Sequence, residues 1–135
     1  MIKVKNRTKT FKINEIPFKD ELIDSFVSNL ITSINIVLLK DDDDLITERI
    51  FAFNEIILQS IHTLKEMKIN FDKHEKEIEK ILSFSIKYYS PNHSDISKMT
   101  ALLCMVKMLG NKKVFEEMKE NEKIQEHLEI IQNQN

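Results

Sequence analysis

The chain has 135 residues and a formal net charge of −2, which is enough length for one domain with a sizeable core. Its 41% of hydrophobic and 31% of charged residues are typical of a globular protein and exclude a disordered one. One glycine and two prolines exclude a glycine-rich phosphate loop, a dinucleotide fingerprint and a nucleophile elbow, because these motifs need several glycines. Abundant isoleucine, lysine and asparagine, with scarce alanine and arginine, indicate an AT-rich genome such as that of a low-GC bacterium or its phage.

Cellular location is predicted from what the sequence lacks. Cys104 is the single cysteine, so there is no disulfide framework and no cysteine-based zinc site. It lies in an apolar stretch and is expected to behave as a small core residue. The first 14 residues lack the apolar region of a secretory signal, and no uninterrupted run of about 18 apolar residues follows. We therefore expect a cytoplasmic protein with no membrane partner.

Positive charge gathers at the N-terminus. Residues 1–14 carry five basic side chains and no acid, whereas the rest of the chain carries 15 basic and 22 acidic ones. The basic residues of this arm are Lys3, Lys5, Arg7, Lys9 and Lys12. Apolar and polar residues alternate along it, which predicts an extended segment or a short hairpin; a tail that orders on binding is the alternative. Residues 1–16 form the basic arm, and Pro17 marks the start of a single α-helical domain over 17–135.

Two long helices are predicted in the first half of that domain. Apolar residues at helical spacing predict a helix over 20–39, and the acidic run 41–44 ends it and can cap the next helix. A second helix over 45–67 is apolar around more than half of its circumference, which indicates a central helix covered on several sides.

A third helix is predicted to open at Asp72, where Asp72 and Glu75 have the spacing of a capping box, and to stop before Pro91. Ser94 or Asp95 can cap a fourth helix, which runs to a left-handed C-terminal cap at Gly110.

The C-terminal stretch carries two apolar faces that are out of phase. Val114, Phe115 and Met118 form the first face. Because the second face is out of phase with it, we expect a break in the helix near Asn121. Five or six helices with short connections predict an all-α compact bundle or a short helical stack. The segment 96–131 resembles one armadillo-type repeat, in which an apolar helix is followed by a turn and two shorter helices, and this resemblance implies the stack.

Metal and acid–base chemistry find little support in the histidines. His74 and Glu75 begin like a zinc-protease motif, but Ile78 occupies the place of the second histidine. His62 lies among isoleucines and is expected in or beside the core, and His93 is expected to be exposed. We predict no cofactor and no metal site.

Carboxylates offer two further patterns. The run 41–44 lacks the glycine that an EF-hand loop needs at its sixth position, so a solvated acidic turn is favoured over a calcium site. The pairs Glu117/Glu120 and Glu126/Glu129 have the i, i+3 spacing with which MazG-like all-α pyrophosphohydrolases hold magnesium. Interleaved lysines favour an ordinary salt-bridged surface instead.

The leading prediction is a non-enzymatic protein-interaction module, a small regulator, adaptor or inhibitor whose partner is another protein or a second copy of itself. Methionines suit adaptable apolar surfaces, and the candidate binding residues in the C-terminal half are Met99, Met105, Met108 and Met118. The first alternative is a nucleic-acid-associated factor that contacts phosphates through the basic arm. The second is the magnesium-dependent nucleotide pyrophosphohydrolase.

Overall fold

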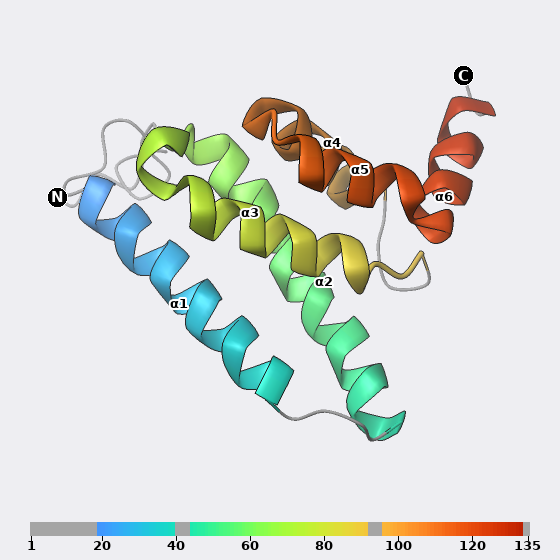
Figure 1. Ribbon diagram of the computed structural model, residues 1–135, viewed down its shortest axis with the longest axis horizontal. Helices are drawn as coiled ribbons and strands as arrows, with labels where there is room; N and C mark the ends of the chain where they lie inside the picture. Colours follow the sequence, from blue (N-terminus) through green and yellow to red (C-terminus); the bar gives the residue numbers. More distant parts are fainter. Residues whose placement is uncertain (1–18, 40–43, 92–95, 134–135) are drawn as a thin grey trace, which may run out of the picture.

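The computed structural model describes residues 19–39, 44–91 and 96–133, and within these ranges the chain forms six helices and no strand (Figure 1). The predicted all-α bundle is therefore confirmed. The helices are α1 Lys19–Leu39, α2 Asp44–Met67, α3 Phe71–Lys87, α4 Ile96–Leu109, α5 Lys112–Glu120 and α6 Glu122–Asn133. Several predictions fall outside the described residues: the arm 1–16, the boundary at Pro17, the acidic residues 41–43, His93, and the caps Ser94 and Asp95.

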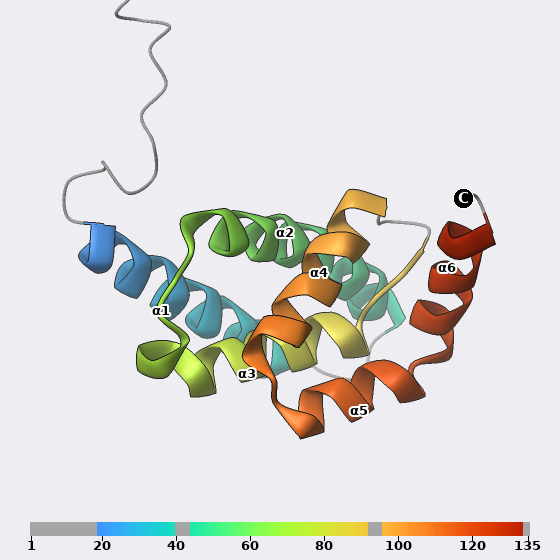
Figure 2. The ribbon, with the colours of Figure 1, turned by 90° about the horizontal axis from the view of Figure 1, so that it is seen from above.

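Helix α3 lies at the centre of the bundle and packs against α1, α2, α4 and α5. Seen from above, α2 lies on one side, α3 and α5 lie on the other, and α4 crosses between them (Figure 2). The predicted covering of α2 on several sides is also found, because α2 packs against α1, α3 and α4. Helices α1 to α6 all contribute fully or nearly fully buried side chains to one core, for example Ile34, Ile57, Leu82, Leu102, Val114 and Ile124.

The C-terminal caps of two helices use the left-handed backbone conformation. Gly110 has φ +65° and its N–H donates to the carbonyl of Val106 at 3.2 Å, as predicted. Lys68 takes the same conformation after α2, with φ 52°, although it carries a side chain. The single glycine of the chain thus occupies one of the two left-handed positions in the described residues, and a lysine occupies the other.

The cap that begins α3 differs from the prediction. Asn70, not the Asp72–Glu75 pair, is the N-cap, and its side-chain oxygen accepts a hydrogen bond from the Asp72 N–H at 2.9 Å. Asn70 has the extended backbone that an N-cap requires, and its side chain pairs with one of the free N–H groups at the start of the helix. Asp72 therefore lies inside the helix and is not its cap.

Two asparagines fasten both ends of α5 to α3, and the predicted break at Asn121 is one of them. The side-chain oxygens of Asn111 and Asn121 each accept the backbone N–H three residues on, at 3.2 and 3.0 Å, which caps α5 and α6. Their amide groups point the other way: Asn111 donates to Glu79 at 2.9 Å, and Asn121 donates to the carbonyl of Ile86 at 2.7 Å. An asparagine provides both the acceptor and the donor that these positions use.

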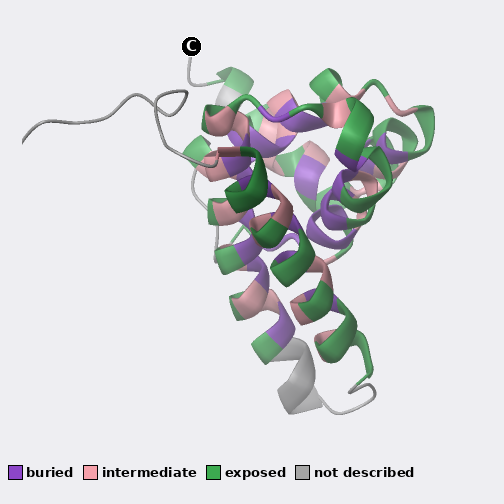
Figure 3. Cartoon of the chain, turned by 90° about the vertical axis from the view of Figure 1, so that its left-hand side faces the viewer, coloured by how far each residue is buried: buried purple, intermediate pink, exposed green. Residues whose placement is uncertain are grey.

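Helices α1 and α2 lie side by side and extend beyond the other helices toward their connection (Figure 3). Helix α1 buries one face, formed by Ile23, Val27, Leu30 and Ile34. Its other faces expose four large apolar side chains, Leu22, Ile36, Leu38 and Leu39.

Helix α1 is long and apolar enough to cross a membrane by length and composition, although the sequence has no uninterrupted run of about 18 apolar residues. The serine, threonine and asparagine residues that interrupt its apolar run leave the mean hydropathy high. The same test is passed by core helices of other proteins, and in this structure α1 packs against α3.

Candidate functional site

A two-residue connection between α4 and α5 creates an open corner. Gly110 turns the chain and Asn111 immediately caps α5, so the two helices meet with no intervening loop. A side chain at Gly110 would have no atom within 4 Å, which shows that the space around the turn is unfilled. A cavity of about 360 Å³ lies here, and its walls are Val106, Lys107, Gly110, Asn111, Lys112 and Phe115.

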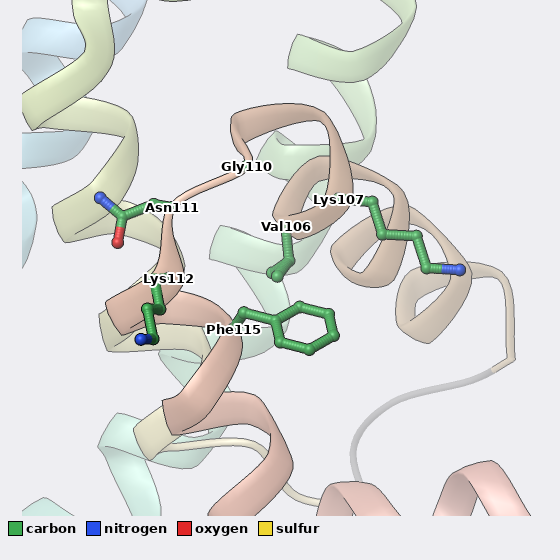
Figure 4. Close-up of a pocket in the computed structure, with 6 residues that line it drawn as sticks. All are labelled: Val106, Lys107, Gly110, Asn111, Lys112 and Phe115. Carbon is green, nitrogen blue, oxygen red and sulfur yellow. The ribbon is translucent and has the colours of Figure 1, made fainter.

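The floor of this cavity is apolar. Figure 4 shows the side chains of Val106 and Phe115 near each other inside the corner, while Lys107 and Lys112 extend outward on different sides. Val106 is buried, whereas 41% of the Phe115 surface is exposed. Among the phenylalanines with described burial, Phe115 is the exposed one. The ammonium group of Lys119 lies 5.4 Å from the centre of its ring.

Both cavity lysines remain available for other partners. Lys107 and Lys112 are exposed and form no ion pair within the described residues, and no carboxylate lines the cavity. The neighbouring Lys113 differs, because its ammonium group lies 3.5 Å from a carboxylate oxygen of Glu79. The cavity is thus a small apolar hollow with uncompensated positive charge at its edge.

The four methionines predicted to form an exposed apolar surface do not do so. Met99, Met105 and Met118 are buried in the core with at most 3% of their surface exposed, so this part of the prediction is wrong. The helical spacing that placed them on one face turned that face inward. Met108 is 52% exposed and does not line the cavity.

Phe115 is the site residue that sequence reasoning missed. The sequence places it with Val114 and Met118, but those two are buried, and Phe115 lies about 100° of helix rotation from Val114 and about 60° from Met118. The lysines at positions 112, 113 and 119 around it were the available signal, since buried faces seldom lie between exposed charges.

The glutamate pairs suggested for magnesium are spread over the surface. Glu117 is half-buried and accepts a hydrogen bond from the Ser83 hydroxyl at 2.8 Å, whereas Glu120, Glu126 and Glu129 are exposed. Within the described residues, no group of three or more His, Cys, Asp or Glu side chains could hold a metal ion.

Cys104 and the described histidines occupy intermediate or buried positions. His62 is half-buried, in agreement with a place beside the core, and Cys104 is half-buried where full burial was expected. His127 contacts the hydroxyl of Tyr89, which is fully buried.

The seam between α1 and α3 holds a pair of side chains with shifted pKa values. Asp24 accepts a hydrogen bond from the Lys73 ammonium group at 2.9 Å, and its other oxygen lies 2.8 Å from Nε2 of the buried His74. The hydrogen bond from Lys73 is the main cause that lowers the pKa of Asp24, and the same bond raises the pKa of Lys73.

This cluster predicts a specific acid sensitivity. A carboxylate whose pKa is lower in the folded state stabilises the fold above its unfolded-state pKa, and this stabilisation is lost as the pH falls through the lowered value. Asp24→Asn should therefore lower the thermal midpoint near neutral pH, and the difference from the wild type should vanish at pH values well below 3.8. It should also shrink at high pH, above the raised pKa of Lys73.

Thermal melts across this pH range check the prediction, with Glu120→Gln as a control that removes an exposed carboxylate lacking such partners. A constant difference between wild type and Asp24→Asn at acidic pH would contradict it.

Two further cavities, of about 200 and 210 Å³, open along the same α1–α3 seam. Apart from the exposed Glu77, their charged groups are already engaged. Lys80 donates to Asn35, Lys87 lies over the ring of Tyr88, and Asp24 binds Lys73. The α4–α5 corner is therefore the better candidate for an external partner.

The chain matches no family model, and comparison with curated proteins and with solved structures gives no significant match.

Proposed function

We propose that this chain is a non-enzymatic protein-interaction module, a small regulator, adaptor or inhibitor, that docks its partner at the α4–α5 corner. The observation that carries the proposal is the exposed Phe115 beside a cavity with an apolar floor. Aromatic side chains with a polar surround are the usual energetic centre of protein interfaces.

The test places a photo-crosslinking amino acid at position 115 and, as a matched control, at the exposed position 76 on α3. In the source cells, position 115 should give a discrete adduct that position 76 does not give. An adduct of twice the chain mass would identify a second copy as the partner. Identical adduct patterns at both positions would contradict the proposal.

A second pair of variants separates this site from general surface apolarity. Phe115→Ser should abolish co-purification of the partner that crosslinking has identified. Met108→Gln should retain it, because Met108 is exposed but lies outside the cavity. Equal loss in both variants would argue against docking at this corner.

The two alternatives have no comparable support from the described residues. The basic arm of the nucleic-acid hypothesis lies outside them, and the glutamates of the hydrolase hypothesis are either exposed or already bonded to Ser83.

A further inference from the structure

We propose that the segment docking at the α4–α5 corner is acidic: a short stretch of a partner protein that carries carboxylates beside one bulky apolar side chain. This inference rests on the proposed function, and it names the chemistry of the partner. Lys107 and Lys112 flank the apolar floor that Val106 and Phe115 form (Figure 4).

The charge of this corner differs from that of the chain beyond the N-terminal arm. Helix α4 carries two lysines and no acidic residue, although acidic residues outnumber basic ones beyond the N-terminal arm. The cavity edge holds two lysines that have no carboxylate partner within the described residues, whereas Lys73, Lys98 and Lys113 each have one. Most lysines of the described residues likewise form no ion pair, so what distinguishes this corner is that its two unpaired lysines flank an apolar floor.

Lys112 lies at the N-terminus of α5. The first turn of a helix favours acidic residues, because the helix dipole and the unpaired N–H groups make that end positive. Helices α1, α3 and α6 follow this rule with Asp20, Asp72 and Glu122 in their first turns, whereas the first turn of α4 has no acidic residue. Helix α5 begins instead with Lys112 and Lys113, and its first turn has no acidic residue.

Lys113 is paired with Glu79, but Lys112 has no ion pair within the described residues and does not favour the start of a helix. Departures from local stability rules are typical of functional sites. The dipole and the lysine together attract a carboxylate more strongly than either does alone. The positive end of α5 thus lies directly beside the apolar floor.

The size and shape of the cavity limit what can bind there. About 360 Å³ is at the low end of ligand-binding pockets and fits one bulky apolar side chain with its adjoining backbone. Phe115 and both lysines are exposed, so the cavity opens to solvent and a chain can continue past it on either side. A peptide segment with an apolar anchor and flanking carboxylates satisfies both requirements.

The experiment uses three short fluorescein-labelled peptides with the same apolar residues and with Glu, Gln or Lys at the flanking positions. Fluorescence anisotropy with the full chain should show the Glu peptide binding about 5–10-fold more tightly than the Gln peptide, and the Lys peptide binding most weakly. Raising the salt concentration should weaken binding of the Glu peptide and leave binding of the Gln peptide nearly unchanged.

Charge-reversal variants assign the effect to the corner. Lys107→Glu and Lys112→Glu should each weaken binding of the Glu peptide by about 5–10-fold. Lys76→Glu makes the same change of charge on the exposed side of α3 and should have no effect. Lys112→Glu should also raise the thermal midpoint by about 1–4 °C, because it places an acid at the start of α5. Weaker binding by a more stable variant excludes unfolding as the cause.

The outcomes separate this inference from the proposed function. Equal affinity for the Glu and Gln peptides, with both lost in Phe115→Ser, would overturn the acidic preference and leave docking at the corner intact. Tightest binding of the Lys peptide, or binding of the Glu peptide that neither lysine variant changes, would also overturn it. Absence of binding by all three peptides, together with no position-specific adduct at position 115, would overturn both.

Discussion

Leu82→Ala should lower the free energy of unfolding by about 3 kcal/mol, within the range of about 2–5 kcal/mol for leucines in protein cores. Leu82 is fully buried on α3, the helix that packs against four others, so the lost side chain leaves a cavity that no single neighbour can fill. For a domain of this size, the loss is a large share of a total stability of about 5–15 kcal/mol.

Leu22→Ala is the matched control, since it makes the same change on α1 at a side chain that is 47% exposed. Its cost should stay below about 1 kcal/mol. Urea unfolding followed by far-ultraviolet circular dichroism measures both, because the chain is helical and has no tryptophan for fluorescence. Equal costs for the two variants would contradict the central place of α3.

Asn121→Ala should be strongly destabilising for a change at a helix connection, with an expected cost of about 2 kcal/mol. The substitution removes the cap of α6, worth about 1 kcal/mol, and the hydrogen bond to the carbonyl of Ile86 at the end of α3, worth about 1 kcal/mol. The two losses add because they come from different atoms of one amide.

Asn121→Asp tests this division of roles. The carboxylate keeps the acceptor that caps α6 but cannot donate to Ile86, so its cost should be about half that of alanine. Asn35→Ala removes an exposed asparagine bonded to Lys80 and should stay within about 0.5 kcal/mol of the wild type. An aspartate variant as unstable as the alanine variant would contradict this division of roles.

Helical periodicity was enough to predict the fold. The spacing of apolar residues, together with Gly110 and the change of phase near Asn121, predicted the positions of the helices closely, because each signal acts within one or two turns of chain. The first residue of a helix is harder to predict than its position along the chain. Asn70 and Asp72 can both cap α3, and the backbone conformation, which the sequence does not give, decides in favour of Asn70.

The candidate site was harder to predict because it depends on contacts between helices. Met99, Met105 and Met118 were candidates for an exposed surface, and the neighbours that bury them come from other parts of the chain. Phe115 resembles a core residue beside Val114 in the sequence, but the neighbouring helices leave its side of α5 exposed. A periodic pattern identifies a face, but only the packing of helices shows what covers it.

The two asparagines that hold α5 against α3 also set a limit on the chemical lifetime of the protein. Asparagine is among the residues that heat degrades, since its amide can hydrolyse to a carboxylate. At Asn111 that reaction would preserve the cap of α5 while replacing the donor to Glu79 by a second negative charge. Prolonged heating should therefore loosen α5 irreversibly, and with it the corner that carries Phe115, in molecules whose backbone is still intact.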